Sequence, residues 1–176
     1  MEAWLVILIF VLVCLGMNVL MYAIGWYGNK KNYSMYRKNK FLPPGFLIGI
    51  VWIGIFASLG YAFYLAYTGK NFEGKTEPEK WSAATIAIVV VASYCLFYPF
   101  LTMVMHERYI VVLNLIALLM AAALSIIVIN EYVAAFWYTL PLLVWCAYVV
   151  FADIMQYNSM IEKYGFNMTK SKSKSK

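Results

Sequence analysis

Residues 42–64 read LPPGFLIGIVWIGIFASLGYAFY, and this stretch joins two prolines, several small residues and large aromatic rings. Proline is tolerated in the first turn of a helix because the first N–H groups there have no intrahelical acceptor. The apolar residues after Pro44 suffice for a helix that crosses the ~30 Å hydrocarbon core of a bilayer. The aromatic rings recur at nearly helical spacing, at Phe46, Trp52 and Phe56. The stretch therefore predicts a membrane helix that packs closely through glycines and lines a pocket with aromatic rings.

The composition of the whole chain supports a membrane location. Of its 176 residues, 64% are hydrophobic and only 12% are charged, and a soluble domain of this size could not bury so much apolar surface. The net charge of +6 comes from basic residues in loops and in a tail, so membrane topology explains it better than nucleic-acid binding.

Further apolar runs predict an all-α membrane protein, a bundle of five transmembrane helices. The expected spans cover residues 3–27, 44–67, 81–105, 110–129 and 133–157. Because five is an odd number, the two termini are expected on opposite sides of the membrane. Residues 1–158 form the expected transmembrane domain, and the basic Lys-Ser-rich tail at 159–176 is expected to be disordered.

The distribution of Lys and Arg orients the predicted bundle. With the N-terminus outside, eleven basic residues fall in the first loop, the third loop and the tail, and three fall outside. The positive-inside rule favours this arrangement, which places the basic C-terminus inside.

A few polar residues interrupt the apolar runs. A carboxylate at Asp153 costs about 2.5–3.5 kcal/mol at mid-bilayer, so it is expected either to face the bundle interior or to snorkel to the interface. Asn18 and Asn114 are expected to hydrogen-bond between helices. Pro99 and Pro141 are expected to kink the third and fifth spans.

Catalysis is not indicated by the sequence. His106 is the only histidine and lies in a predicted turn, and Asp153 lacks a second catalytic group. The three cysteines match no metal-ligand spacing. We therefore favour a protein that is not an enzyme, with no metal and no obligate cofactor. An enzyme that degrades or isomerises a hydrophobic ligand with Asp153 as acid or base stays open as the last-ranked alternative.

Several of these features occur together in one known family. Pro-Pro-Gly-Phe at 43–46 precedes Trp52, and Pro141-Leu-Leu-Val-Trp145 precedes Asp153 by eight residues. With five spans and a basic tail, the chain resembles the translocator protein family (TspO/MBR), also called tryptophan-rich sensory proteins or peripheral benzodiazepine receptors.

The resemblance implies a pocket within the helix bundle, lidded by the first loop, that binds porphyrins, haem, sterols such as cholesterol, or other hydrophobic molecules. The residues that it places in the pocket are Phe46, Gly49, Trp52, Phe56, Tyr94, Phe97, Asn114, Trp145, Tyr148, Val149 and Asp153. It also implies the mitochondrial outer membrane in a eukaryote and a bacterial or other cell membrane otherwise.

The chain departs from the family pattern at several of these positions. Phe46 replaces a tryptophan, and Tyr94-Cys95-Leu96-Phe97 replaces Asn-Trp-x-Trp. The family has Asp near the start of the fourth helix and Asn in the fifth, whereas this chain has Asn114 and Asp153.

Two non-enzymatic functional hypotheses follow. The first is a receptor or translocator that binds a hydrophobic small molecule. The alternative is a non-catalytic accessory or scaffold subunit of a larger membrane complex, which a filled core and outward-facing glycines would favour. The Gly45-x-x-x-Gly49 pair fits either an internal helix contact or a homodimer. The expected partners are thus the lipid bilayer, a small molecule and a second copy of the chain.

Overall fold

The structure is a computed structural model that describes residues 2–27, 39–71, 74–75, 81–104 and 107–173. Five helical segments are long and apolar enough to cross a membrane. The first four correspond to single helices: α1 (Ala3–Tyr27), α3 (Gly45–Thr68), α4 (Ala83–Val104) and α5 (Glu107–Glu131). The fifth comprises α6 (Val133–Phe136) and the start of α7 (Leu140–Ser173). The predicted five-span helical bundle is confirmed, and the chain is a multi-pass integral membrane protein.

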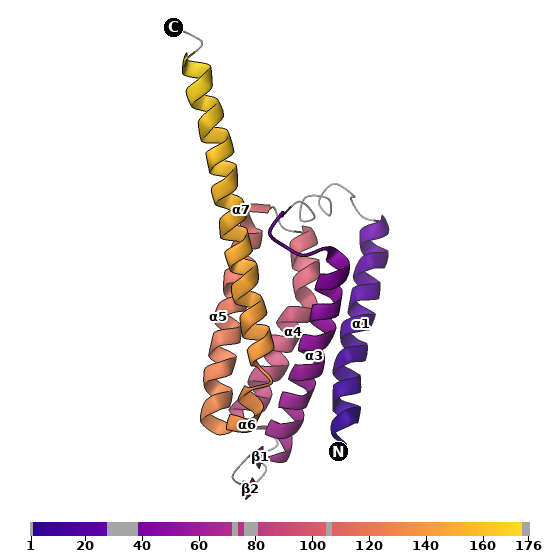
Figure 1. Cartoon of the computed structure of the whole chain (residues 1–176). Coiled ribbons are helices and arrows are strands. Elements are labelled where there is room, and N and C mark those ends of the chain that lie inside the picture. Colours follow the sequence, from indigo (N-terminus) through magenta and orange to yellow (C-terminus); the bar gives the residue numbers. More distant parts are fainter. Residues whose placement is uncertain (1, 28–38, 72–73, 76–80, 105–106, 174–176) are drawn as a thin grey trace.

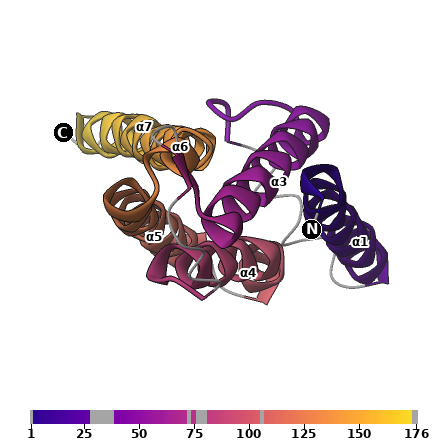
Figure 2. The ribbon, with the colours of Figure 1, turned by 90° about the horizontal axis from the view of Figure 1, so that it is seen from below.

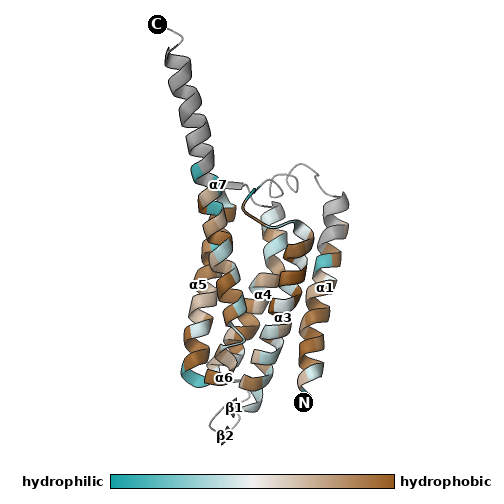
Figure 3. Cartoon of the chain, in the orientation of Figure 1, coloured by the Kyte–Doolittle hydropathy of each residue, from teal (hydrophilic) through white to brown (hydrophobic). Residues whose placement is uncertain are grey.

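The long helices run side by side (Figure 1), and α3, α4, α5 and α7 surround a common centre with α1 packed outside against α3 (Figure 2). Hydrophobic residues cover the length of all five spans, and polar residues gather where the chain before α3 meets α7 (Figure 3). The many large apolar side chains on the outer surface are those expected to contact lipid. Which end faces the inside remains a prediction.

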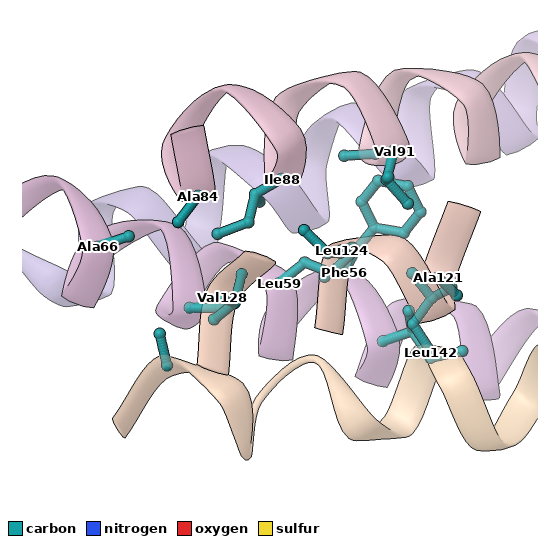
Figure 4. Close-up of a cluster of buried hydrophobic side chains, with 14 of the residues drawn as sticks. Phe56, Leu59, Ala66, Ala84, Ile88, Val91, Ala121, Leu124, Val128 and Leu142 are labelled. Atoms are coloured by element: carbon teal, nitrogen blue, oxygen red, sulfur yellow. The ribbon is translucent and has the colours of Figure 1, made fainter. Parts of the chain in front are cut away.

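The centre of the bundle is filled by side chains from four helices (Figure 4). Its largest fully buried members include Leu59 from α3, Ile88 from α4, Leu124 from α5 and Leu142 from α7. Lipid tails are as apolar as leucine, so van der Waals packing rather than exclusion of water holds such a core together.

Gly60 is the glycine that allows α1 and α3 to approach closely. A Cβ atom at Gly60 would lie 3.1 Å from the Cα atom of Ile7 and 3.2 Å from the Cβ atom of Phe10. Gly45 and Gly49, by contrast, have no heavy atom within 4 Å of such a position among the residues compared. The Gly45/Gly49 pair therefore makes no tight contact within the described chain, and its role in a homodimer stays a prediction.

The fifth span is not the single kinked helix that the sequence predicted. It is interrupted at residues 137–139, and α7 restarts with Pro141 in its first turn. A proline ring clashes with the carbonyl four residues earlier, which here is that of Trp137, and the helix is broken rather than kinked at this point. Tyr138 N and Thr139 N instead donate to carbonyls three residues back. At Pro99, by contrast, α4 continues as a helix.

Two further segments differ from the sequence-based description. The helix α7 continues to Ser173, far beyond the bundle (Figure 1), where a disordered tail was expected. Residues 159–173 contain no proline, and extending an existing helix avoids the cost of nucleation. The predicted loop at 68–80 contains two antiparallel strands, β1 (Lys70–Asn71) and β2 (Gly74–Lys75), after a left-handed C-cap at Gly69.

Candidate functional site

A groove of about 590 Å³ lies between α3 and α7. We call it the α3–α7 groove, and it is lined by Val51, Gly54, Ile55, Ser58, Pro141, Val144, Trp145 and Tyr148. Since Gly54 and Val144 are exposed, the groove opens on the outer, lipid-facing side of the bundle. Its lining spans eight residues on each helix, from 51 to 58 and from 141 to 148, and the seven steps of helical rise between the ends correspond to a length of about 10 Å.

The break in the fifth span shapes one end of the groove. The Ser58 hydroxyl donates to the Tyr138 carbonyl at 2.9 Å, and this carbonyl belongs to the break. Pro141 lines the groove one turn further along α7. The proline that interrupts the span therefore also places a polar anchor and a rigid wall at this end.

Aromatic rings form the other end of the groove. The ring centroids of Trp145 and Tyr148 are 5.6 Å apart, with the planes tilted by 36°. The Tyr148 hydroxyl donates to the Phe41 carbonyl at 2.5 Å. A flat apolar molecule in the groove would thus contact an indole and a phenol whose polar tip is already held.

A buried polar network lies between the helices at the same end of the bundle. The Asn114 side-chain amide on α5 donates to the Asp153 carboxylate on α7 at 2.5 Å. On the other side, the Tyr98 hydroxyl on α4 donates to the Asn114 side-chain carbonyl. Asn114 and Asp153 are only 4% and 9% exposed. A carboxylate at this depth is tolerated because both of its oxygens accept hydrogen bonds, Oδ2 from Asn114 and Oδ1 from Asn39.

Helical periodicity brings the members of this network together. Leu142, Cys146, Val149 and Asp153 recur every three or four residues and form the buried face of α7. Tyr94 lies one turn before Tyr98 on α4, and its hydroxyl donates to the Leu113 carbonyl at 2.9 Å. The sequence pattern thus directs the carboxylate into the bundle rather than into lipid.

Residues 39–42, which we call the strap, join the network to the groove. Asn39 Nδ2 donates to Asp153 Oδ1 at 3.1 Å, and Lys40 N donates to Gln156 Oε1 at 3.4 Å. With the bond from Tyr148 to Phe41, the strap is attached to α7 at three points. The rest of the predicted lid, residues 28–38, lies outside the described residues.

Comparison with known proteins identifies the family. The sequence matches the TspO/MBR family over residues 8–157, nearly its whole length. The chain belongs to the TspO/MBR family. Searches of curated proteins and of solved structures found no match.

The residues that the TspO/MBR resemblance placed in one pocket are distributed over four environments. Trp145 and Tyr148 line the α3–α7 groove, and Asn114 and Asp153 form the polar network beside Tyr94. Phe56 and Val149 are buried, and Trp52 packs on Phe56 with ring centroids 6.1 Å apart. Gly49 is half-buried, and Phe46 and Phe97 are 73% and 57% exposed.

Several residues of these sites are not among those predicted from the sequence. Tyr98 could have been found, because it lies four residues after Tyr94 and so shares its helical face. Ser58 is one of the small residues in the stretch 42–64, and a hydroxyl one turn from Gly54 also suits a groove. Nothing in the sequence marks Asn39 among the polar residues of the first loop.

Proposed function

We propose that this TspO/MBR protein is a membrane receptor or translocator that binds a hydrophobic small molecule in the α3–α7 groove. A porphyrin, a sterol or a similarly rigid apolar compound fits the chemistry of the lining. The observation that carries the proposal is the groove itself, whose volume of about 590 Å³ falls within the roughly 300–1,000 Å³ of typical ligand sites.

The lining of the groove supports this class of ligand. Val51, Ile55, Pro141 and Val144 supply apolar walls, and Trp145 and Tyr148 supply ring faces for contact with a flat molecule. The hydroxyl oxygens of Ser58 and Tyr148 lie toward opposite ends of the groove, and each retains lone pairs that can accept a hydrogen bond. A ligand with a polar group at its edge would be oriented by them.

The position of the groove also bears on how a ligand would arrive. The TspO/MBR resemblance implied a pocket within the bundle, but core side chains fill the centre between α3, α4, α5 and α7. A groove on the outer surface is open to molecules that have already dissolved in the bilayer. We therefore propose lateral entry from the membrane.

The proposal is tested by a substitution that fills the groove without disturbing the packing of the bundle. A side chain at Gly54 would meet open space, so Gly54→Leu is expected to fold and to project into the groove. Gly16→Leu is the matched control, because Gly16 is equally open but lies on α1. Protoporphyrin IX and a sterol would be titrated against each variant in detergent, with tryptophan quenching as the porphyrin readout.

We expect Gly54→Leu to weaken binding by at least about tenfold, equivalent to ~1.4 kcal/mol, and Gly16→Leu to bind like the wild type. Equal affinity in all three proteins would contradict the proposed location. Absence of wild-type binding to both protoporphyrin IX and the sterol would contradict the proposed function itself.

The scaffold hypothesis keeps one observation in its favour. Gly45 and Gly49 leave a smooth, open surface at the start of α3, and the core is filled. Such a surface suits close approach of a helix from a second copy of the chain. Under this alternative, Gly49→Leu would change the oligomeric mass measured by light scattering in detergent, whereas Gly16→Leu would not.

A further inference from the structure

An unbroken chain of hydrogen bonds connects the buried carboxylate of Asp153 to the wall of the α3–α7 groove. Asp153 Oδ1 accepts from Asn39 Nδ2 at 3.1 Å, and Asn39 Oδ1 accepts from Phe41 N at 3.0 Å. The Phe41 carbonyl then accepts from the hydroxyl of Tyr148, which lines the groove. The side chain of Asn39 therefore transmits the position of the carboxylate to the groove through the strap.

Asp153 does not line the groove, and this chain of hydrogen bonds links it to the groove within the part of the protein that the structure describes. It lies five residues after Tyr148 on α7, which rotates it by about 140° around the helix, away from the groove-lining face. Asp153 is buried against α5, whereas the Tyr148 ring is partly exposed. The structure thus separates the residue that anchors the strap from the residues that would contact a ligand.

A carboxylate suits this anchoring position better than an amide would. Asn114 Nδ2 donates to Asp153 Oδ2, so the other oxygen, Oδ1, is turned toward Asn39. Both partners present N–H donors, and a carboxylate can accept from both at once. An amide at position 153 would offer only one acceptor and would place its own NH₂ group against one of these two donors.

We propose that Asp153 is a positioning residue that, through Asn39, holds strap 39–42 closed over the end of the groove formed by Val51 and Tyr148 and thereby slows ligand release. This inference rests on the proposed function for its effect on the ligand. The attachment of the strap to α7, in contrast, can be measured without any ligand.

The backbone amides of the strap provide that measurement. In the closed strap, Lys40 N bonds to Gln156, Phe41 N to the Asn39 side chain and Leu42 N to the Asn39 carbonyl. The next two residues are Pro43 and Pro44, which have no amide hydrogen. Hydrogen exchange of a peptide covering this segment, followed by mass spectrometry, therefore reports opening of the strap.

The test variant is Asn39→Asp in the full chain reconstituted in nanodiscs. An aspartate keeps the oxygen that accepts from Phe41 N, but it replaces the donor to Asp153 with a second carboxylate. The rescue variant, Asn39→Asp with Asp153→Asn, restores a donor–acceptor pair with the roles exchanged and leaves an acceptor for Asn114. Asn71→Asp in β1 is the matched control, because it adds the same charge to a loop at the opposite end of the bundle.

We expect Asn39→Asp to raise the exchange rates of the strap amides by about tenfold and the release rate of protoporphyrin IX by a similar factor. Both rates should return toward wild-type values in the rescue variant and stay unchanged in Asn71→Asp. If the side chains of residues 39 and 153 were not in contact, Asp153→Asn would not reverse the effect of the charge added at position 39.

Two results would overturn the inference. One is unchanged strap exchange in Asn39→Asp, which would show that Asp153 does not hold the strap. The other is faster strap exchange with unchanged porphyrin release, in a protein whose binding is still weakened by Gly54→Leu. Failure of the proposed function looks different, since the wild type would then show no specific porphyrin or sterol binding, while the exchange data still decide whether Asp153 holds the strap.

Discussion

At the scale of single residues, the glycines of this chain differ in their structural roles. A Cβ atom at Gly60 would lie 3.1 Å from backbone of α1, whereas one at Gly16 would meet open space. We therefore expect Gly60→Leu to force α1 away from α3 and to cost at least about 1–3 kcal/mol of stability, as overpacking does elsewhere. Thermal unfolding in detergent would measure the difference from Gly16→Leu. Equal midpoints for both variants would contradict the close contact of α1 with α3.

The contacts of Asp153 were only partly predictable from the sequence. Asp153 was expected either to face the bundle or to snorkel, and the structure directs it into the bundle against Asn114. The sequence could not supply its second partner, because Asn39 lies 114 positions away in a loop without periodicity. Long-range pairs of this kind depend on tertiary packing, which local patterns do not encode.

At the scale of helices, the pairing of α5 with α7 depends on one carboxylate that faces one amide. The TspO/MBR pattern noted above has Asp on the fourth span and Asn on the fifth, and here the two are exchanged as Asn114 and Asp153. Asn114→Asp would place two carboxylates in contact, and Asp153→Asn would place two NH₂ groups in conflict. Each single variant is expected to lose about 1–3 kcal/mol of stability.

The double variant, Asn114→Asp with Asp153→Asn, should recover most of this loss. Its exchanged pair can still accept from Tyr98 on one side and from Asn39 on the other. Unfolding of the four proteins forms a double-mutant cycle that isolates the coupling. Additive losses in the double variant would show that the two side chains do not act as a pair.

The helices also show what apolar length alone predicts. Runs of about 20 apolar residues gave the five spans correctly, because a bilayer requires that length of helix. The break at 137–139 was predicted only as a kink, since the clash of Pro141 with the carbonyl of Trp137 could be relieved in either way. The extension of α7 to Ser173 was missed because its polar composition was interpreted as disorder.

At the scale of the whole molecule, the candidate ligand site lies at a seam of the bundle rather than in its centre. Side chains from α3, α4, α5 and α7 fill the centre, and the groove follows the seam between α3 and α7 on the lipid side. The family resemblance placed Trp145 and Tyr148 in a pocket within the bundle; both line this outer seam, and their role in binding stays a prediction. The position of the seam depends on the break before Pro141 and on the packing of Ser58, which only the three-dimensional arrangement reveals.

The central claim is that the α3–α7 groove holds a hydrophobic ligand, and photolabelling tests it most directly. A porphyrin or sterol that carries a diazirine would be irradiated with the protein in nanodiscs, and the labelled peptides would be mapped by mass spectrometry. We predict labels within residues 51–58 and 141–148 that unlabelled ligand competes away and that Gly54→Leu removes. Competed labels that gather instead around Phe46, Phe97 and Asn114, with none in the groove, would contradict the account.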